Sequence, residues 1–432
     1  MKLAPATRLY GLGIILLVAL TICSRNFSDR GGLYFMASLT CAGIVYLLAI
    51  RELFATPRFP RHVVVTALLL TTAWHIEFLR LPPGADDDIH RYVWDGRLQR
   101  LGYNPYLVIP SDPAAQGLHT PETRNLNNSD LPSPYPAGAQ LFFRAITAIH
   151  ESTFALKVAF VVCDFAIVFV LFDVLRRKQQ APHLVLAYAW NPLLAIEVAG
   201  SGHIDIVGAL MLVISVAALA RSRRTIAALM LGLAVAVKFL PIVLLPLYWK
   251  RVRIRDALLA AVVVGLLYLP FLDHGRIPVG SLGAYVQNFR FNGPVFAALA
   301  HAAPPKLLAV LAVLVGLVTA TWLRSAAPEW SPHVFAWPMA ASLLCAPAVF
   351  PWYLLWLLPF LTSPSTLLIV VWTVSIIPTY LQWHLRALGR PWGALPAWVM
   401  LVEYGCVAMA SAVIAFRRIS RPSVHRSTNE VV

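Results

Sequence analysis

Charged side chains are scarce in this sequence, and the polar linkers that join soluble domains are missing. Only 13% of the 432 residues are charged, whereas 59% are hydrophobic. Soluble domains carry roughly a quarter charged residues. Apolar runs instead recur along nearly the whole chain and are separated by short basic clusters. This composition excludes a soluble multidomain protein and predicts an all-α, polytopic bundle of transmembrane helices.

Cysteine motifs, phosphate loops and repeats are also missing. The five cysteines lie in or beside apolar runs without a C-x-x-C pair, so we interpret them as small buried hydrophobic residues. No Gly-rich loop is present that would cradle a nucleotide phosphate. No period of about twenty to fifty residues repeats itself, which excludes a solenoid. The absence of internally symmetric halves argues against a secondary transporter.

Positive charge is in excess, with a formal net charge of +15. The Lys and Arg residues cluster at the ends of apolar runs, as the positive-inside rule predicts for cytoplasmic loops. We therefore expect this charge to set the topology and to contact anionic membrane lipids. Nucleic acid is not an expected partner, because no basic face with interleaved aromatic residues is visible. Basic residues near both ends predict that the N- and C-termini are cytoplasmic.

The apolar runs predict a single integral membrane domain, residues 1–432, with about 11 to 13 membrane segments. Three runs precede the longest polar segment, residues 82–152, which the alternation of spans places outside. A structureless connector of that length is unusual, so we expect it to fold and to carry catalytic residues. A second outer loop is predicted at residues 273–305.

Two stretches depart from simple membrane spans. Runs 184–199 and 204–220 predict a helical hairpin whose joint lies at the outer surface. Residues 225–249 lie between two basic clusters and contain Lys238 and Pro241. We expect two half-helices, broken near Pro241, that return to the inner side, because proline interrupts a helix. A single bent span is the alternative.

Three adjacent carboxylates, Asp86, Asp87 and Asp88, directly follow an outward-going run. Such neighbours repel one another and raise at least one pKa unless a cation compensates, which Arg91 could do. A carboxylate at the membrane rim suits a general base that takes a proton from an acceptor hydroxyl. The alternative is a solvated acidic turn that caps the next helix. Asp86 and Asp88 also form a D-x-D pair, so a divalent cation is possible although no cofactor or metal is required.

Ionisable residues inside or at the end of a membrane span are costly and are therefore functional candidates. His203 and Asp205 could be a metal pair or a polar anchor for a sugar, or Asp205 could cap the returning helix. Lys238 could pair with a phosphate group of a membrane-linked substrate. It could equally extend its amine to the inner surface.

Polar and aromatic residues in the later outer segments complete the candidates. Arg290 lies between Asn288 and Asn292 and suits bidentate pairing with phosphate. Trp352 and Tyr353 lie at an outer corner and suit a platform on which a sugar stacks. Their alternative is the aromatic belt that many membrane proteins have at the interface.

These stretches together resemble the GT-C polytopic glycosyltransferases. The specific likeness is to the bacterial polyprenyl-phosphate-mannose-dependent group related to glycosyltransferase family 87 and the alpha-1,6-mannosyltransferases. The resemblance covers most of the chain from Asp87 to Pro359. Its landmarks are Asp87-Asp88-Ile89-His90-Arg91-Tyr92-Val93-Trp94-Asp95-Gly96, Gly102-Tyr103-Asn104-Pro105-Tyr106, Tyr135-Pro136, Trp190-Asn191-Pro192, Gly202-His203-Ile204-Asp205, Lys238 with Pro241, Phe291-Asn292 and Pro351-Trp352-Tyr353. One departure is Phe350, which replaces a frequent histidine before Pro-Trp-Tyr.

The resemblance implies an inverting transfer of a hexose, mannose by family weight, at the outer side of a bacterial inner (plasma) membrane. It implies a polyprenyl-phosphate-linked sugar donor, a lipid or glycan acceptor, and an aspartate base in the first outer loop. We place that base at Asp88, with Asp87 as the alternative. The substrate contacts that it implies are Arg91, Tyr92, Asp95, Tyr135, His203, Asp205, Lys238, Asn288, Arg290, Asn292, Trp352 and Tyr353. A transporter or flippase of a lipid-linked sugar is the alternative function.

Overall fold

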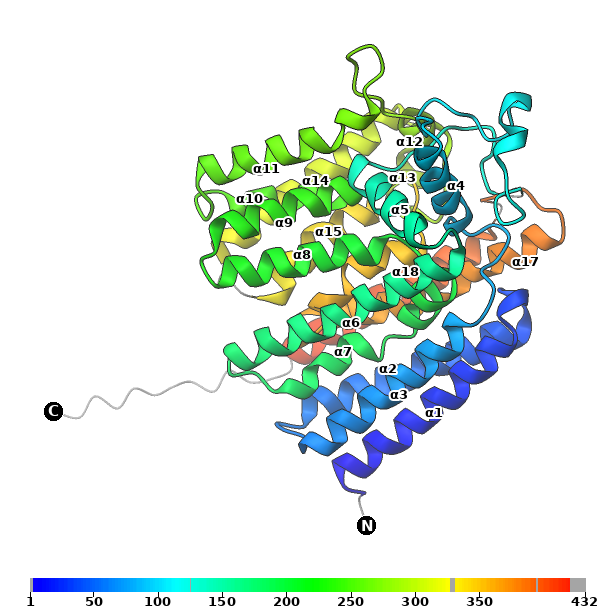
Figure 1. The fold of residues 1–432 in the computed structure, drawn as a ribbon. Helices are drawn as coiled ribbons and strands as arrows, with labels where there is room; N and C mark the ends of the chain where they lie inside the picture. Colours follow the sequence, from blue (N-terminus) through cyan, green and yellow to red (C-terminus); the bar gives the residue numbers. More distant parts are fainter. Residues whose placement is uncertain (1–2, 125, 327–330, 394, 420–432) are drawn as a thin grey trace.

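The chain folds into an all-α bundle (Figure 1). The computed structural model describes residues 3–124, 126–326, 331–393 and 395–419. Within these ranges no strand forms, and the only sheet-like contacts are isolated bridges such as that between Phe291 and Ala348. The predicted fold class is therefore confirmed.

Eight helices in the described ranges are long and apolar enough to cross a membrane, or nine if one bent pair counts as a span. They are α1 (Pro5–Arg25), α2 (Leu33–Ala55), α3 (Arg61–Leu79), α6 (Thr153–Arg177), the α11 segment (Ile254–Phe271), α14 (Pro305–Ala326), the α16–α17 segment (Pro364–Ala387) and α18 (Ala397–Ile419). This number is below the expected 11 to 13, because several apolar runs form short helices. The shorter elements include α9 (Arg224–Val237), α10 (Leu245–Tyr248), α15 (Pro332–Leu344) and the 3₁₀ helix η7 (Pro351–Trp356).

The long helices lie side by side, with α1–α3 on one side of the bundle and α9–α11 on the opposite side (Figure 1). Helices α6 and α8 (Asp205–Ala220) pack against each other between these two sides. Large apolar side chains such as Leu258, Val318 and Leu401 are exposed on the outer faces of α11, α14 and α18. Such faces suit contact with lipid, where apolar exposure carries no penalty.

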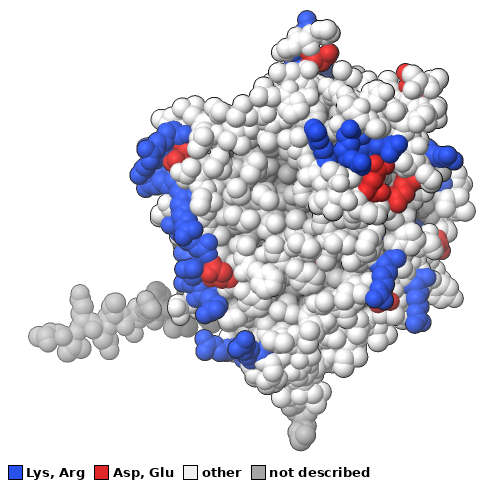
Figure 2. All heavy atoms as spheres, viewed as in Figure 1, with Lys and Arg blue, Asp and Glu red and all other residues white. Residues whose placement is uncertain are grey.

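On the face shown in Figure 2, charged side chains gather toward the edges of the molecule. Figure 2 shows Lys and Arg gathered along the edge where the turns of α8–α9 and α10–α11 lie, beside a wide uncharged band. Exposed basic residues at this edge include Arg177, Arg223 and Arg253. An uncharged band between charged edges is the surface expected of a bundle embedded in a bilayer.

The predicted hairpin at residues 184–220 is present only in its second half. Its first run is broken into short pieces, α7 (Leu186–Ala189) and the π-helix η4 (Leu194–Gly200), and η4 meets α8 at an angle of 113°. Pro192 lies at the break, because proline lacks the N–H that would continue the helix. The Asn191 side chain accepts a hydrogen bond from the Leu193 N–H and donates one to Thr373. The bend between η4 and α8 lies further along, at residues 201–204 between the two predicted runs, and α8 begins there with the buried Asp205.

The stretch 225–249 has the predicted broken, returning shape. Helix α9 ends at Val237, Lys238 has an extended backbone, and the chain continues through the 3₁₀ helix η5 (Leu240–Leu244) into α10. The turns before α9 and after α10 lie on the same edge of the bundle (Figure 1). The break therefore leaves Lys238 at the turning point of this stretch, inside the bundle.

The two polar segments fold at the other end of the bundle. The first segment, residues 82–152, contains α4 (Ile89–Arg100) and α5 (Ala137–Ile149), which pack against each other. The second, residues 273–305, contains α12 (Leu282–Asn288) and α13 (Pro294–Leu299). Figure 1 shows these four helices together. The Ser281 hydroxyl joins the segments by donating to the Pro132 carbonyl at 2.8 Å.

Candidate active site

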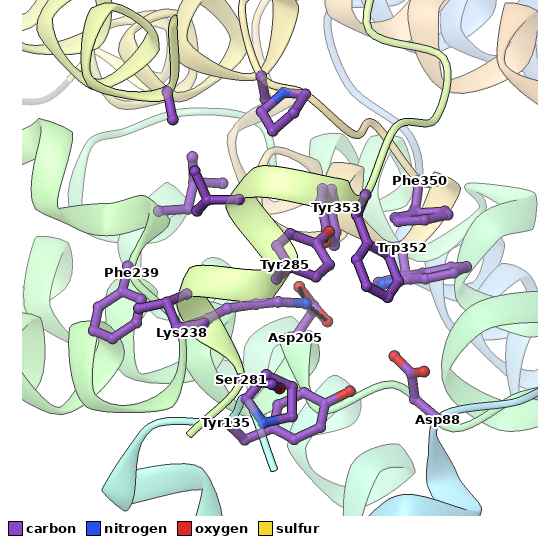
Figure 3. Close-up of a pocket in the computed structure, with 18 of the residues that line it drawn as sticks. Asp88, Tyr135, Asp205, Lys238, Phe239, Ser281, Tyr285, Phe350, Trp352 and Tyr353 are labelled. Carbon is purple, nitrogen blue, oxygen red and sulfur yellow. Dashed lines mark hydrogen bonds and ion pairs between the residues drawn. The ribbon is translucent and has the colours of Figure 1, made fainter. Parts of the chain in front are cut away.

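A cavity of about 840 Å³ lies where the two polar segments meet the bundle. Its polar wall includes Asp88, Asp205 and Lys238, and Figure 3 shows these three side chains converging. The opposite wall is apolar and is built by η5, α14 and α15. The cavity therefore joins a charged chamber to an apolar arm.

Two carboxylates of the acidic triplet, Asp86 and Asp88, line this cavity, and Asp88 is the one at the start of α4. It is the N-cap residue of α4, and its Oδ1 accepts a hydrogen bond from Asn127 Nδ2 at 2.9 Å. The Tyr135 hydroxyl points toward Asp88 in Figure 3. Burial raises the pKa of Tyr135 well above its usual value, with the charge of Asp88 adding to the effect. The tyrosine is therefore a protonated donor that, together with Asn127, orients the carboxylate.

Asp205 and Lys238 form an ion pair in the floor of the chamber. Lys238 Nζ lies 2.8 Å and 2.7 Å from the two carboxylate oxygens of Asp205. Trp356 Nε1 donates to Asp205 Oδ1 at 2.7 Å. Asp205 is fully buried, whereas the Lys238 side chain is 22% exposed and lies over the Tyr353 ring at 4.4 Å. The ammonium group thus keeps one face open to the cavity, and Asp205 is not paired with His203.

Aromatic residues form a stacked wall beside the two acids. The ring centroids of Phe350 and Trp352 lie 4.4 Å apart, and those of Trp352 and His203 lie 4.2 Å apart. The rings within each pair are nearly parallel, at 5° and 7°. Tyr353 and Tyr285 join their hydroxyl groups on the adjacent wall. Because Phe291 stacks on Phe350 in turn, and Phe350 and Trp352 are 4% and 7% exposed, these rings present edges to the cavity, beside the two tyrosine hydroxyl groups.

Two arginines predicted to contact the substrate, Arg91 and Arg290, are held by backbone carbonyls. Arg91 donates to the carbonyls of Leu131, Asn127 and Asn128 at 2.6–3.1 Å. Arg290 donates to three carbonyls at the end of α12, at 2.6–3.2 Å, and lies over the Phe296 ring. Both line the cavity, as Asn288 does. Their hydrogen bonds fix the loops that carry the site.

Tyr92 and Asp95 lie behind the cavity wall, in the buried face of α4. Tyr92 stacks on Phe143 of α5 with centroids 4.4 Å apart. Asp95 Oδ2 accepts hydrogen bonds from Ser133 and Gln140. Burial raises the pKa of Asp95 to about 6, while Arg91 acts in the opposite direction. These two residues shape the first polar segment and do not line the cavity.

Asp87, His203 and Asn292 also lie outside the cavity lining. Asp87 points away from Asp88 and pairs with Arg30 at 2.7 Å. His203 Nδ1 lies 2.9 Å from Glu197 Oε2, behind Trp352. Asn292 donates to Glu403 of α18 at 2.7 Å and so anchors the second polar segment. Of the predicted residues, the structure brings these together in the cavity lining: Asp88, Arg91, Tyr135, Asp205, Lys238, Asn288, Arg290, Trp352 and Tyr353.

Asn127, Tyr285 and Arg386 are among the residues of the cavity wall that the sequence reasoning missed. Asn127 and Tyr285 carry little signal, because Asn and Tyr are frequent in loops. Arg386 follows an apolar run, where a basic residue is ordinarily interpreted as a topology signal. Its guanidinium Nε lies 3.8 Å from Asp86 Oδ2 across the cavity mouth. Among the residues that the structure describes, no group of three or more His, Cys, Asp or Glu residues could hold a metal ion.

Comparisons with known proteins bear on what this cavity does. Neither the curated proteins nor the solved structures include a match to the chain. The family model for the N-terminal domain of alpha-(1->6)-mannopyranosyltransferases matches residues 18–252, a stretch that holds Asp88, Asp205 and Lys238. Because this match covers more than half of the 432 residues, the chain belongs to that family of membrane glycosyltransferases.

Proposed function

We propose that this enzyme transfers mannose from a polyprenyl-phosphate donor to a hydroxyl group of a lipid-linked or glycan acceptor. The transfer takes place on the outer side of a bacterial plasma membrane, with inversion at the anomeric carbon and Asp88 as general base. The observation that carries the proposal is the single cavity that joins Asp88 to an apolar arm.

The apolar arm suits the polyprenyl chain of the donor. It is lined by Phe239 and Leu240 beside η5 and by Ala312 and Val313 of α14. Phe239 is 39% exposed and Val313 is 37% exposed, so the arm reaches the outer apolar surface of the bundle. An isoprenoid chain gains about 0.8 kcal/mol for each CH₂ group that leaves water, which favours such a groove.

Lys238 suits the phosphate of the donor, because it lies where the apolar arm meets the charged chamber. Its ammonium group has a third N–H beyond the two that face Asp205. Asp205 holds the ammonium group at this point. In this proposal the lysine balances the phosphate charge, so no metal ion is required. A preparation treated with EDTA is then expected to keep its activity.

The chemistry is a direct displacement. Asp88 accepts the proton of the acceptor hydroxyl while the acceptor oxygen forms a bond to the anomeric carbon. The bond between that carbon and the phosphate oxygen breaks, and polyprenyl phosphate leaves with the electron pair. Lys238 stabilises the added negative charge on the leaving phosphate. The edges of Phe350 and Trp352 and the hydroxyl groups of Tyr285 and Tyr353 hold the sugars in line between the two groups.

The test is transfer by the purified protein in lipid nanodiscs, with radiolabelled polyprenyl-phosphate-mannose as donor and a membrane lipid or glycan extract as acceptor. We expect labelled product from this donor and none from GDP-mannose, with the product anomer opposite to that of the donor. Transfer from GDP-mannose alone would contradict the proposal. Movement of the intact labelled donor across a vesicle membrane, without any transfer, would favour the flippase alternative.

A further inference from the structure

A buried ion pair lies directly behind the proposed base. Arg30, in the connection between α1 and α2, donates to Asp87 Oδ1 at 2.7 Å, and both side chains are 5% exposed or less. The other carboxylate oxygen of Asp87 accepts the Gly84 N–H at 2.7 Å. The same nitrogen of Arg30 donates to the Ser201 hydroxyl at 2.6 Å, just before α8. The arginine thus joins the first polar segment to the bend that places Asp205.

The guanidinium group of Arg30 is confined on every side. It lies over the Phe27 ring at 4.9 Å and the Trp383 ring at 5.4 Å. A Cβ atom at Gly84 would overlap the guanidinium, so only glycine fits there. Gly31, next in the chain, has a φ of +89° and leaves no room for a side chain against the backbone of Tyr380. The packing around Arg30 therefore restricts its guanidinium group to one position.

This pairing separates the roles of the three adjacent carboxylates. Asp87 is neutralised and turned into the protein, and Asp86 lies 3.8 Å from Arg386 at the cavity mouth. Among the described residues, no ion pair of this kind involves Asp88, which lines the chamber and accepts a hydrogen bond from Asn127. Asp88 directly follows Asp87 and already has a helical backbone as the first residue before α4, so anchoring Asp87 inside the protein also restrains the direction of the Asp88 side chain.

We propose that Arg30 is a positioning residue for the transfer reaction, which fixes the carboxylate of Asp88 through Asp87. This role rests on the proposed function of Asp88 as base. It also gives the α1–α2 hairpin a part in catalysis, although neither helix contributes a side chain to the cavity lining.

The experiment compares kcat and the KM for polyprenyl-phosphate-mannose in Arg30→Gln, Arg30→Lys, Asp87→Asn and the double variant Arg30→Gln/Asp87→Asn. Arg8→Gln is the matched control, because Arg8 pairs with Glu52 at 2.9 Å on the same two helices and far from the cavity. Thermal unfolding of each purified variant measures folding separately.

We expect Arg30→Gln to lower kcat about 100-fold and to change KM less than about threefold, because the groove for the donor is untouched. Arg30→Lys is expected to lie between this variant and the wild type, since it keeps the charge but not the planar fork. The double variant is expected to recover at least about tenfold of kcat over Arg30→Gln, because no unpaired buried carboxylate remains. Arg8→Gln is expected to match the wild type.

Two results would overturn the inference: Arg30→Gln as active as Arg8→Gln, or a rise in KM with kcat unchanged. If Arg30→Gln does not fold, Gly84→Ala displaces the guanidinium without a change of charge, and the same loss of kcat at constant KM is expected. An unchanged kcat in Gly84→Ala would equally overturn the inference. A wild type that transfers no mannose would instead refute the proposed function, so the two failures are distinct.

Discussion

Among the acidic residues of the first polar segment, burial and partners decide which one is chemically available. The triplet Asp86-Asp87-Asp88 could be predicted from the sequence as the acidic centre of the site, with Asp88 ahead of Asp87. The reason for that order could not, because Arg30, which removes Asp87 from the cavity, is 57 residues away in the chain. For Arg290, in contrast, the hydrogen bonds argue against the role that the sequence suggests. Its position suggests phosphate binding, but its two terminal nitrogens donate to backbone carbonyls at the end of the preceding helix, α12.

The buried carboxyl group of Asp95 is expected to make the stability of the protein depend on pH. Burial raises its pKa from 3.8 to about 6, so the folded chain binds more protons than the unfolded chain between these values. The contribution of Asp95 to the free energy of unfolding therefore falls by roughly 3 kcal/mol as the pH rises from about 4 to about 6, and it does not change further above that pH. Asp95→Asn lacks this contribution.

We expect the free energy of unfolding of the wild type, relative to Asp95→Asn, to be higher at pH 4.5 than at pH 7 by about 2 kcal/mol. Chemical unfolding of both proteins in detergent at the two pH values measures this difference. Parallel pH dependences of wild type and variant would show that the buried carboxyl does not titrate in this range.

At the scale of the secondary-structure element, breaks in the apolar helices bring the residues of the site together. The break at Lys238 could be predicted, because Pro241 and the flanking basic clusters are visible in the sequence. The break at Asn191-Pro192 was not predicted, since an unbroken apolar run is also compatible with one span. At this break Asn191 donates a buried hydrogen bond to the distant Thr373, whereas the 113° bend between η4 and α8 lies further along the chain, at residues 201–204. Periodicity alone does not reveal such contacts.

The close packing of α8 on η7 gives a test at this scale. A Cβ atom at Gly208 would overlap the Trp356 ring, whose N–H donates to Asp205. We expect Gly208→Ala to cost about 1–3 kcal/mol of stability. We also expect it to lower transfer activity, because Trp356 must shift away from Asp205.

The control is Gly265→Ala on α11, where an added Cβ would meet nothing within 4 Å. Melting temperature and transfer rate of the two purified variants provide the comparison. The control is expected to keep both values, since alanine is a better helix former than glycine. Equal behaviour of the two variants would refute the packing argument.

At the scale of the whole molecule, the fold class follows from composition, and the pairing of distant segments does not. The family match ends at residue 252, whereas the aromatic wall and α14 come from later residues. The cavity therefore needs both halves of the chain. The number of spans was overestimated because apolar runs such as 335–349 form helices too short to cross a membrane, as α15 does.

The separation of charge predicts the orientation of the bundle. We propose that the basic edge faces the cytoplasm and the two polar segments face outward. In a cysteine-free background, Gln116→Cys in the first polar segment is expected to react with a membrane-impermeant maleimide on intact cells. Gln180→Cys, after α6, is expected to react only once the membrane is permeabilised. Both positions are exposed. The reverse pattern of labelling would invert the proposed topology.

The central claim is that Asp88 is the base of a lipid-donor mannosyl transfer, and the most direct measurement is the kcat of Asp88→Asn. This variant keeps the shape of the side chain but removes its basicity. Asp130→Asn, an exposed position on the same segment, is the control. The account predicts a loss of about 10²–10⁴-fold in kcat for Asp88→Asn, with donor KM nearly unchanged and the control active. A kcat for Asp88→Asn equal to that of Asp130→Asn would contradict it.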